Sequence, residues 1–263
     1  MQNPWDLYDN LIEDISDELR VDYFTQGLYW TLVRSGSTTG VAMTVKQTGP
    51  KMLENRDVTG MKLKEVARLS KSWDFTEASI GVAALNAYYN SKEKVENLGG
   101  FVGFDINNLS YEERIEKNAF INSYDEIKDK NIAVIGHFPD LEIKLKDHCN
   151  LSILERNPSK GDYPDPACEY ILRDQDYVFI TGMALTNKTL PRLLELSRKK
   201  AKISIVGPSI PIAKVLSDYG VSNISGFCVL DSEMLDLIIR SGGRRSIFKS
   251  GIMISRSFND KIY

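Results

Sequence analysis

The sequence has few of the side chains that bind soft metal ions or form disulfides. Its 263 residues include 2 histidines and 3 cysteines. Cys149, Cys168 and Cys228 are odd in number and far apart, which excludes a disulfide framework. No C-x-x-C pair and no zinc-type histidine spacing is present. The pattern therefore predicts reduced cysteines in a cytoplasmic protein.

Signals for export and for membrane insertion are also lacking. The first fifteen residues, MQNPWDLYDNLIEDI, have neither the basic segment nor the apolar core of a signal peptide. No apolar run approaches the roughly 18 residues that a transmembrane helix needs. The net charge of −3 is not the basic surplus of a general nucleic-acid binder. We expect a cytoplasmic protein whose partner is a small molecule or a metal ion, not a nucleic acid or a membrane; the oligomeric state stays open.

What the sequence does contain is a repeated unit of buried strand, glycine and helix. Three short apolar runs are each closed by a glycine and followed by a helical pattern: Ile132–Ile135 with Gly136, Tyr177–Ile180 with Gly182, and Ile203–Val206 with Gly207. Nearly unbroken apolar strands are typical of a sheet covered on both faces. The alternation predicts an α/β fold with a Rossmann-like, doubly wound, mostly parallel sheet, whose ligands bind at the carboxyl ends of the strands.

The first part of the chain has a different pattern. An amphipathic helix is followed by alternating residues typical of a hairpin, and then by Ser79–Asn90, a helix that is apolar nearly all round. Asn86 is conspicuous in that helix because a buried amide needs partners. We therefore expect two domains, a smaller α+β domain at residues 1–110 and a Rossmann-like ligand-binding domain at residues 111–263.

Helix caps place several polar residues at the predicted ligand edge. Pro191 is tolerated only in a first helical turn, so Thr189 is the expected N-cap and Met183–Lys188 are expected to form a loop. Asn187 and Lys188 then lie beside a helix N-terminus, which favours an anion. By the same reasoning Ser209 caps a helix that contains Pro211, leaving Gly207, Pro208 and Ser209 at the end of another strand.

The first strand-to-helix turn, VIGHFPDLE, lacks the G-x-G-x-x-G pattern of dinucleotide sites. Glu155 nevertheless closes the second strand at the place of a ribose-binding acid. His137 is a candidate base or metal ligand. A metal site would have to be assembled across loops, and its candidate ligands are His137, Glu155, Asp162, Asp165 and Cys168.

Six stretches of the chain carry a family resemblance: SIGVAALNAYYN, VIGHFP, ERNPSKGDYPDP, DYVFITGMALTNKTL, IVGPSIP and GVSNISGFCVLD. Together they resemble the family described as "putative heavy-metal chelation", whose members are otherwise of unknown function. The resemblance extends from about Tyr23 to Gly243. It implies an α+β domain similar to the enolase N-terminal domain, followed by a Rossmann-like domain.

Three interpretations of function follow. The first is a small-ligand or metal-ion binding protein with its site in the cleft between the two domains, where the resemblance implies a divalent ion and His137 and Glu155 are the candidate metal ligands. The second is an enzyme that binds a nucleoside-type cofactor, with Glu155 on the ribose. The third is a subunit whose cleft serves another protein. The residues expected to line the cleft are Asn86, Gly136, His137, Glu155, Thr181, Gly182, Asn187, Lys188, Gly207, Pro208 and Ser209.

Overall fold

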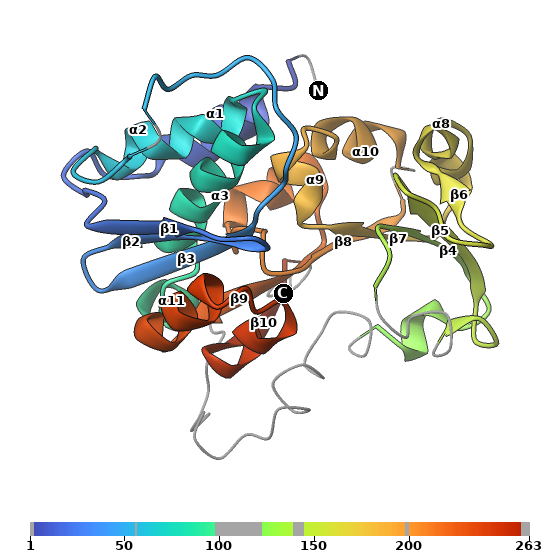
Figure 1. Ribbon diagram of the computed structural model, residues 1–263. Coiled ribbons are helices and arrows are strands. Elements are labelled where there is room, and N and C mark those ends of the chain that lie inside the picture. The colour runs from blue at the N-terminus through green and yellow to red at the C-terminus, as the bar shows by residue number, and fades with distance from the viewer. Residues whose placement is uncertain (1–2, 56, 98–122, 139–144, 198–199, 259–263) are drawn as a thin grey trace.

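Two β-sheets form the frame of the computed structural model (Figure 1), which describes residues 3–55, 57–97, 123–138, 145–197 and 200–258. A three-stranded antiparallel sheet has the order β1-β2-β3, and a seven-stranded sheet has the order β10-β9-β8-β7-β4-β5-β6. The strands are β1 (Tyr23–Gln26), β2 (Trp30–Ser35), β3 (Thr38–Met43), β4 (Asn131–Ile135), β5 (Asn150–Glu155), β6 (Tyr163–Pro164), β7 (Tyr177–Thr181), β8 (Lys202–Val206), β9 (Asn223–Val229) and β10 (Gly251–Ser257).

Most helices of the fold are short. The α-helices are α1 (Asp6–Glu13), α2 (Leu63–Arg68), α3 (Phe75–Tyr89), α4 (Lys92–Asn97), α8 (Cys168–Ile171), α9 (Met183–Thr186), α10 (Leu190–Leu196) and α11 (Ser232–Arg240). The 3-10 helices are η1 (Leu69–Lys71), η3 (Asp125–Ile127), η4 (Asp165–Ala167), η5 (Leu172–Asp174), η6 (Lys214–Tyr219) and η7 (Arg245–Lys249). Within the described ranges, none of the helices combines the length and apolarity that a membrane crossing requires.

The larger sheet confirms the predicted α/β class and its Rossmann-like strand arrangement. β4 pairs in parallel with both β5 and β7, while β10 runs antiparallel beside β9. Counted from β4 in chain order, β4 to β9 lie in the order 3-2-1-4-5-6 of a doubly wound nucleotide-binding sheet. The strand order therefore reverses between β4 and β7, and the carboxyl ends of these two strands border the crevice where such sheets bind ligands.

The helix α3 is buried on nearly every side, as its composition predicts. Asp74 caps it through hydrogen bonds from the backbone N–H groups of Thr76 and Glu77 to its carboxylate. The strand β3 packs directly on this helix at Gly40, where a Cβ would fall on backbone atoms of α3. The small sheet and α3 therefore form one tightly packed unit.

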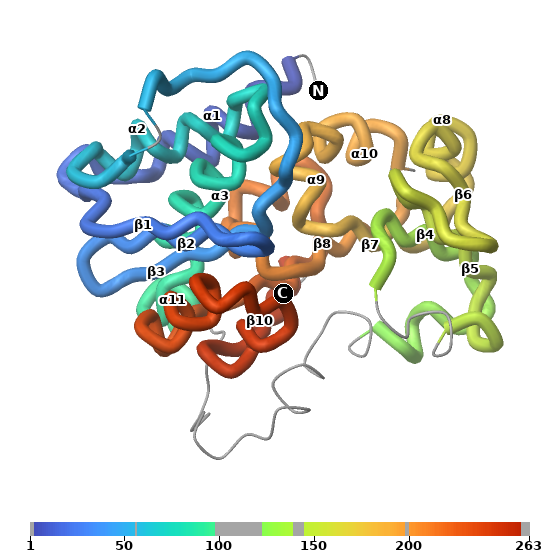
Figure 2. Tube along the Cα trace, viewed as in Figure 1, coloured from blue at the N-terminus to red at the C-terminus, as the bar shows by residue number. Residues whose placement is uncertain are grey.

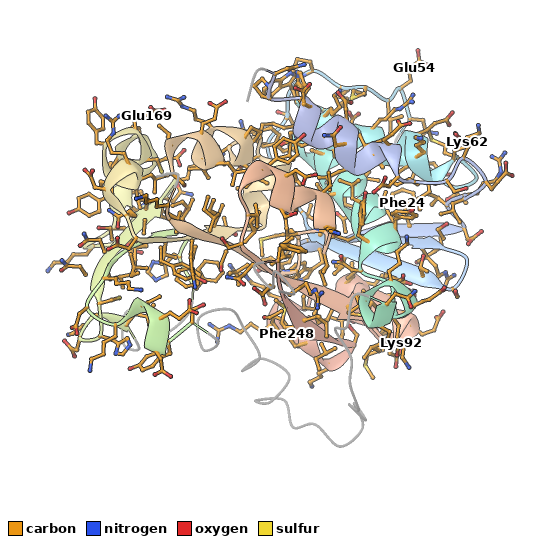
Figure 3. The ribbon with its side chains drawn as sticks, turned by 180° about the vertical axis from the view of Figure 1, so that it is seen from behind. Phe24, Glu54, Lys62, Lys92, Glu169 and Phe248 are labelled. Carbon is orange, nitrogen blue, oxygen red and sulfur yellow. The ribbon has the colours of Figure 1, made fainter. Side chains whose placement is uncertain are left out.

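The amino-terminal elements share a continuous hydrophobic core with the larger sheet. One cluster of buried side chains contains residues of α1, α3, β7, β8 and β9. Figure 2 shows β7, β8 and α9 between the amino-terminal elements and the strands β4 to β6. Lys62 and Glu169 lie at opposite ends of the molecule (Figure 3). The predicted domain division at residues 110 and 111 lies outside the described residues.

Two local predictions are wrong. Residues 183–186 form the short helix α9 instead of a loop, because Ala184 and Leu185 turn inward and are buried. No α-helix begins at Ser209; residues 209–213 are irregular, and the 3-10 helix η6 begins at Lys214. The amide of Asn90 accepts from the N–H of Ile212 and donates to the carbonyl of Ile210, so α3 takes the backbone groups that an α-helix would use.

Candidate functional site

The end of β4 lies against the end of β7 through a glycine. Gly136 has a φ of 100°, and a Cβ there would lie 3.0 Å from the Cβ of Thr181. Its N–H donates to the carbonyl of Leu154 at the end of β5. Glycine thus permits both the left-handed backbone and the close approach of Thr181. The next residue, His137, is thereby held at the point where the strand order reverses.

His137 is paired with a buried carboxylate. Its Nδ1 lies 3.2 Å from Oδ2 of Asp162, whose side chain is 1% exposed, whereas the imidazole is 37% exposed. The same Oδ2 accepts a hydrogen bond of 2.8 Å from the N–H of Ser159. A carboxylate only accepts hydrogen bonds, so the facing ring nitrogen of the neutral imidazole carries the proton and the lone pair lies at Nε2. The pair therefore presents a fixed electron-pair donor at the ligand edge.

Asp162 also has an oxygen to spare. Its Oδ1 is buried and has no hydrogen-bond partner among the described residues. Buried carboxylate oxygens are normally satisfied, so an orphan of this kind indicates a place for a ligand or an ordered water. Asp162 was a candidate metal ligand in the sequence, but its role behind His137 depends on the path of the loop between β5 and β6, which no local pattern encodes.

Glu155 turns its carboxylate onto backbone amides. Its Oε2 accepts a hydrogen bond of 2.8 Å from the N–H of His137, and its Oε1 accepts one of 2.7 Å from the N–H of Arg156. Carboxylate oxygens have further lone pairs, so Glu155 can still accept from a ligand. Glu155 therefore contacts the backbone of His137, and the two predicted metal ligands lie at the same edge of the sheet.

The other candidate metal ligands are engaged or unreactive. Asp165 pairs with the guanidinium of Arg156 at 3.6 Å. Cys168 is buried, and burial raises the pKa of its thiol to about 12, so it is not the thiolate that soft metals bind. Within the part of the chain that the structure describes, no three histidine, cysteine, aspartate or glutamate side chains converge on one point as a metal site.

A second group of predicted residues packs α3 and β3 against the larger sheet. Nδ2 of Asn86 donates to the carbonyls of Val41 and Pro208, at 2.8 and 3.1 Å, while its Oδ1 is buried with no hydrogen-bond partner among the described residues. Ser209 is buried and accepts from the N–H of Met43 at 2.8 Å. These side chains hold elements together, and Oδ1 of Asn86 is a buried acceptor without a partner among the described residues.

Glycines allow the close approach within this group. A Cβ on the buried Gly182 would lie 3.0 Å from the backbone nitrogen of Ile210. Gly207 has a φ of 128°, which favours glycine. The structure therefore brings Asn86, Gly182, Pro208 and Ser209 together, but as a packed seam.

The third group is the loop between α9 and α10. The predicted start of α10 at Thr189 is confirmed, with Pro191 in the first turn. Oδ1 of Asn187 accepts from both N and Oγ1 of Thr189, at 3.1 and 2.7 Å, so this amide oxygen shapes the loop. Lys188 has a φ of 69°, and its Nζ donates to the carbonyl of Thr186 at 2.7 Å. Burial lowers the pKa of this amine to about 7.

The predicted residues thus fall into three neighbouring places. Gly136, His137, Glu155 and Thr181 form the carboxyl edge, where His137 and Thr181 retain exposed surface. The seam residues lie beside it, since Gly182 follows Thr181 directly. Asn187 and Lys188 follow α9, one helical turn further along. At the carboxyl edge, polar side chains lie close together and still have lone pairs available to a ligand.

Comparison with known families gives two matches along this chain. Two family models, both described as "Putative heavy-metal chelation", match residues 8–89 and residues 118–257. An uncharacterized protein of Methanocaldococcus jannaschii is 28% identical over 257 residues, which cover 91% of this chain and 90% of that protein.

Two crystal structures of proteins of unknown function share the fold. The one from Desulfitobacterium hafniense has a TM-score of 0.87 and 37% identity, covering 98% of this chain and 100% of that chain. The one from Pyrococcus horikoshii has a TM-score of 0.74 and 22% identity, covering 97% of this chain and 99% of that chain. The second likeness concerns the fold alone.

Proposed function

The chain belongs to the family described as "Putative heavy-metal chelation", and on this premise we propose that it binds a divalent metal ion at the carboxyl edge, with Nε2 of His137 as the first contact. The ion is cargo in this proposal, not a resident cofactor. The site lies at Gly136 and Thr181, where the strand order of the large sheet reverses.

One observation carries the proposal: the hydrogen bond between His137 and the buried Asp162. Histidines that bind metals almost always donate their other ring N–H to a carboxylate or a carbonyl, which fixes the tautomer and raises the basicity of the ligating nitrogen. Here Asp162 is buried and the imidazole is part-exposed. The carboxylate is therefore shielded from water, while Nε2 of His137 is left to bind a ligand.

The number of protein donors refines the proposal. In the described ranges, Nε2 of His137 and the carboxylate of Glu155 are the proposed contacts, because Asp162 pairs with the other ring nitrogen and no three such side chains converge as a metal site. A bare ion would therefore keep most of its coordination positions for water. We propose that the preferred cargo is a borderline ion such as Zn²⁺, Ni²⁺ or Cu²⁺, which imidazole suits, carried with a small chelating ligand that fills the remaining positions.

Calorimetric titration tests the proposal with a histidine control. Zinc, nickel and copper are titrated, each alone and as its citrate complex, into the native protein and into the variants His137→Ala and Asp162→Asn. We expect His137→Ala to abolish the tightest site and Asp162→Asn to weaken it by about tenfold or more. His148→Ala is the matched control, because His148 precedes β5 at the opposite edge of the sheet and bonds the carbonyl of Tyr124. A tightest site that survives in His137→Ala, or none tighter than that of an exposed histidine, would contradict the proposal.

A second candidate is a nucleoside-type cofactor, favoured by the position of Glu155. This residue ends β5, the second strand of a sheet with nucleotide-binding order, where an acid commonly binds ribose hydroxyls. Titration with adenosine and with NAD tests this candidate directly: Glu155→Gln should weaken nucleoside binding, whereas His137→Ala should leave it and abolish only the metal site.

A further inference from the structure

The amine of Lys188 occupies an unusual position between two helices and two aromatic rings. Lys188 follows α9 with a left-handed backbone, at a φ of 69°, and among the described residues only Asp129 shares a positive φ without being glycine. This conformation is unfavourable for a residue that carries a side chain. The loop therefore holds Lys188 in place against a local preference.

The surroundings of Nζ are nearly free of charge. The ammonium nitrogen lies 5.1 Å from the ring centre of Phe75 and 5.8 Å from that of Tyr8. Tyr8 is itself neutral, because burial raises its pKa and its hydroxyl donates to the carbonyl of Leu185. In the described part of the chain, no carboxylate lies within ion-pairing distance of Nζ. Among the residues that the structure describes, the polar contact of Nζ is the carbonyl of Thr186, at 2.7 Å.

Such surroundings favour the neutral amine. Desolvation without a counter-charge lowers the pKa to about 7, so about half of the population carries a free lone pair at neutral pH. The hydrogen bond to Thr186 uses one N–H, so the lone pair of the neutral amine points away from that carbonyl. Lys188 also keeps part of its surface exposed, so a small molecule can reach it.

We propose that Lys188 is a nucleophilic amine that captures a small uncharged aldehyde as an imine. The Nζ lone pair attacks the carbonyl carbon, and proton transfer from nitrogen to oxygen gives a neutral carbinolamine. Loss of the hydroxyl group together with the second nitrogen-bound proton releases one water molecule and leaves a carbon–nitrogen double bond. No oxidant or reductant takes part, and hydrolysis reverses the capture.

The class of carbonyl compound follows from the walls of the site. Two aromatic rings and a backbone carbonyl offer dispersion contacts and no donor for an anionic group. A carboxylate or a phosphate on the substrate would lose its hydration without gaining a partner, which disfavours its binding. An aliphatic aldehyde without charge meets no such penalty. We therefore place keto acids and sugar phosphates outside the class.

Reductive trapping on the native full-length protein tests this inference. Glycolaldehyde is added at low concentration with sodium cyanoborohydride at pH 7, and the modified lysines are identified by peptide mass spectrometry. An ordinary lysine, with a pKa near 10.4, is about 1 part in 2,500 neutral at this pH. Even after allowance for the weaker nucleophilicity of a less basic amine, Lys188 should react at least about tenfold faster than the exposed Lys202.

The pH profile and a charged probe complete the test. Labelling of Lys188 should level off just above pH 7, well below the pH at which an ordinary lysine amine becomes neutral. Pyruvate should label Lys188 no faster than Lys202. If glycolaldehyde labels Lys188 no faster than Lys202, or if pyruvate is preferred, the inference is overturned. The assay needs no metal, so it stands or falls independently of the metal proposal.

Discussion

Asn90 accepts a hydrogen bond of 2.7 Å from the N–H of Ile212, although 122 residues separate the two in the chain. Its Nδ2 also donates to the carbonyls of Ile210 and Phe227, at 3.0 and 3.2 Å. One amide at the end of α3 thus satisfies three buried backbone groups of the larger sheet and the segment after β8. This residue is a main polar tie between the two parts of the fold.

Asn90→Ala should therefore destabilise the protein strongly. The variant leaves three buried backbone groups without their partner, which costs roughly 2–4 kcal/mol in the free energy of unfolding. Urea unfolding monitored by tryptophan fluorescence measures the change. Asn10→Ala is the control, because exposed Asn10 has a single side-chain bond, to Tyr219, and its loss should change stability by less than about 0.5 kcal/mol. Equal effects of the two variants would contradict the role of Asn90.

Gly40→Ala should prevent the close packing of β3 on α3. The added Cβ would fall on the carbonyl oxygen of Ala83 and the backbone nitrogen of Ala87, neither of which can move without distorting the helix. Overpacking of this kind costs about 3 kcal/mol or more. Thermal unfolding measures the loss. Gly36→Asn is the control, because Gly36 has open space around it and a left-handed backbone that asparagine tolerates.

Lys188→Met should stabilise the protein most at neutral and lower pH. The lysine pKa is lowered from about 10.4 in the unfolded chain to about 7 in the folded protein. Between these values the unfolded chain binds more protons, so the contribution of Lys188 to stability rises as the pH rises from 7 to 10. Below pH 7 the folded protein carries the full cost of a buried ammonium.

The stability difference between Lys188→Met and the native protein isolates this effect. We expect the difference at pH 6.5 to exceed that at pH 9.5 by roughly 1–3 kcal/mol, in favour of the methionine variant. Urea unfolding at the two pH values gives the numbers. A difference that is constant with pH would show that the amine titrates as an exposed lysine.

Cleavage of the chain between the amino-terminal elements and the larger sheet should not separate the two fragments. The sequence predicts the first protease cuts between Asp105 and Lys130, where apolar periodicity fades. The hydrophobic core is continuous, and Asn86 and Asn90 bond backbone groups in the segment after β8. The two fragments should therefore elute together on gel filtration and separate only in urea. Separation in native buffer would mean that the domains at residues 1–110 and 111–263 are independent.

The sequence predicts well those features that depend on local patterns. Unbroken apolar runs place β4, β7 and β8, and the single glycines after them mark the ligand edge. Asp74 with Glu77 three residues later has the pattern of a helix N-terminus, and Asp74 caps α3; Thr189 is correctly placed at the start of α10. In each case the interaction that determines the structure involves residues only a few positions from the predictive pattern.

Predictions fail where a distant partner decides the structure. Ser209 and Pro211 have the pattern of a helix start, but Asn90 takes the backbone groups of that segment and Ser209 bonds Met43. The partner of His137 was equally beyond local reasoning, because Asp162 comes 25 residues later and reaches the imidazole through an irregular loop. Asn86 and Ser209 are predicted to face a ligand, yet the amide N–H groups of Asn86 and the hydroxyl oxygen of Ser209 bond backbone groups of other elements.

The hydrogen bond from the His137 amide to Glu155 changes what this Rossmann-like frame can select. Sheets of this order commonly offer free backbone N–H groups after the first strand, which attract phosphate. Here a carboxylate already occupies that amide, so an approaching phosphate would meet negative charge in place of a donor. The frame is retained, but this turn offers a carboxylate where related sheets offer a free amide, so a bare phosphate finds no donor there.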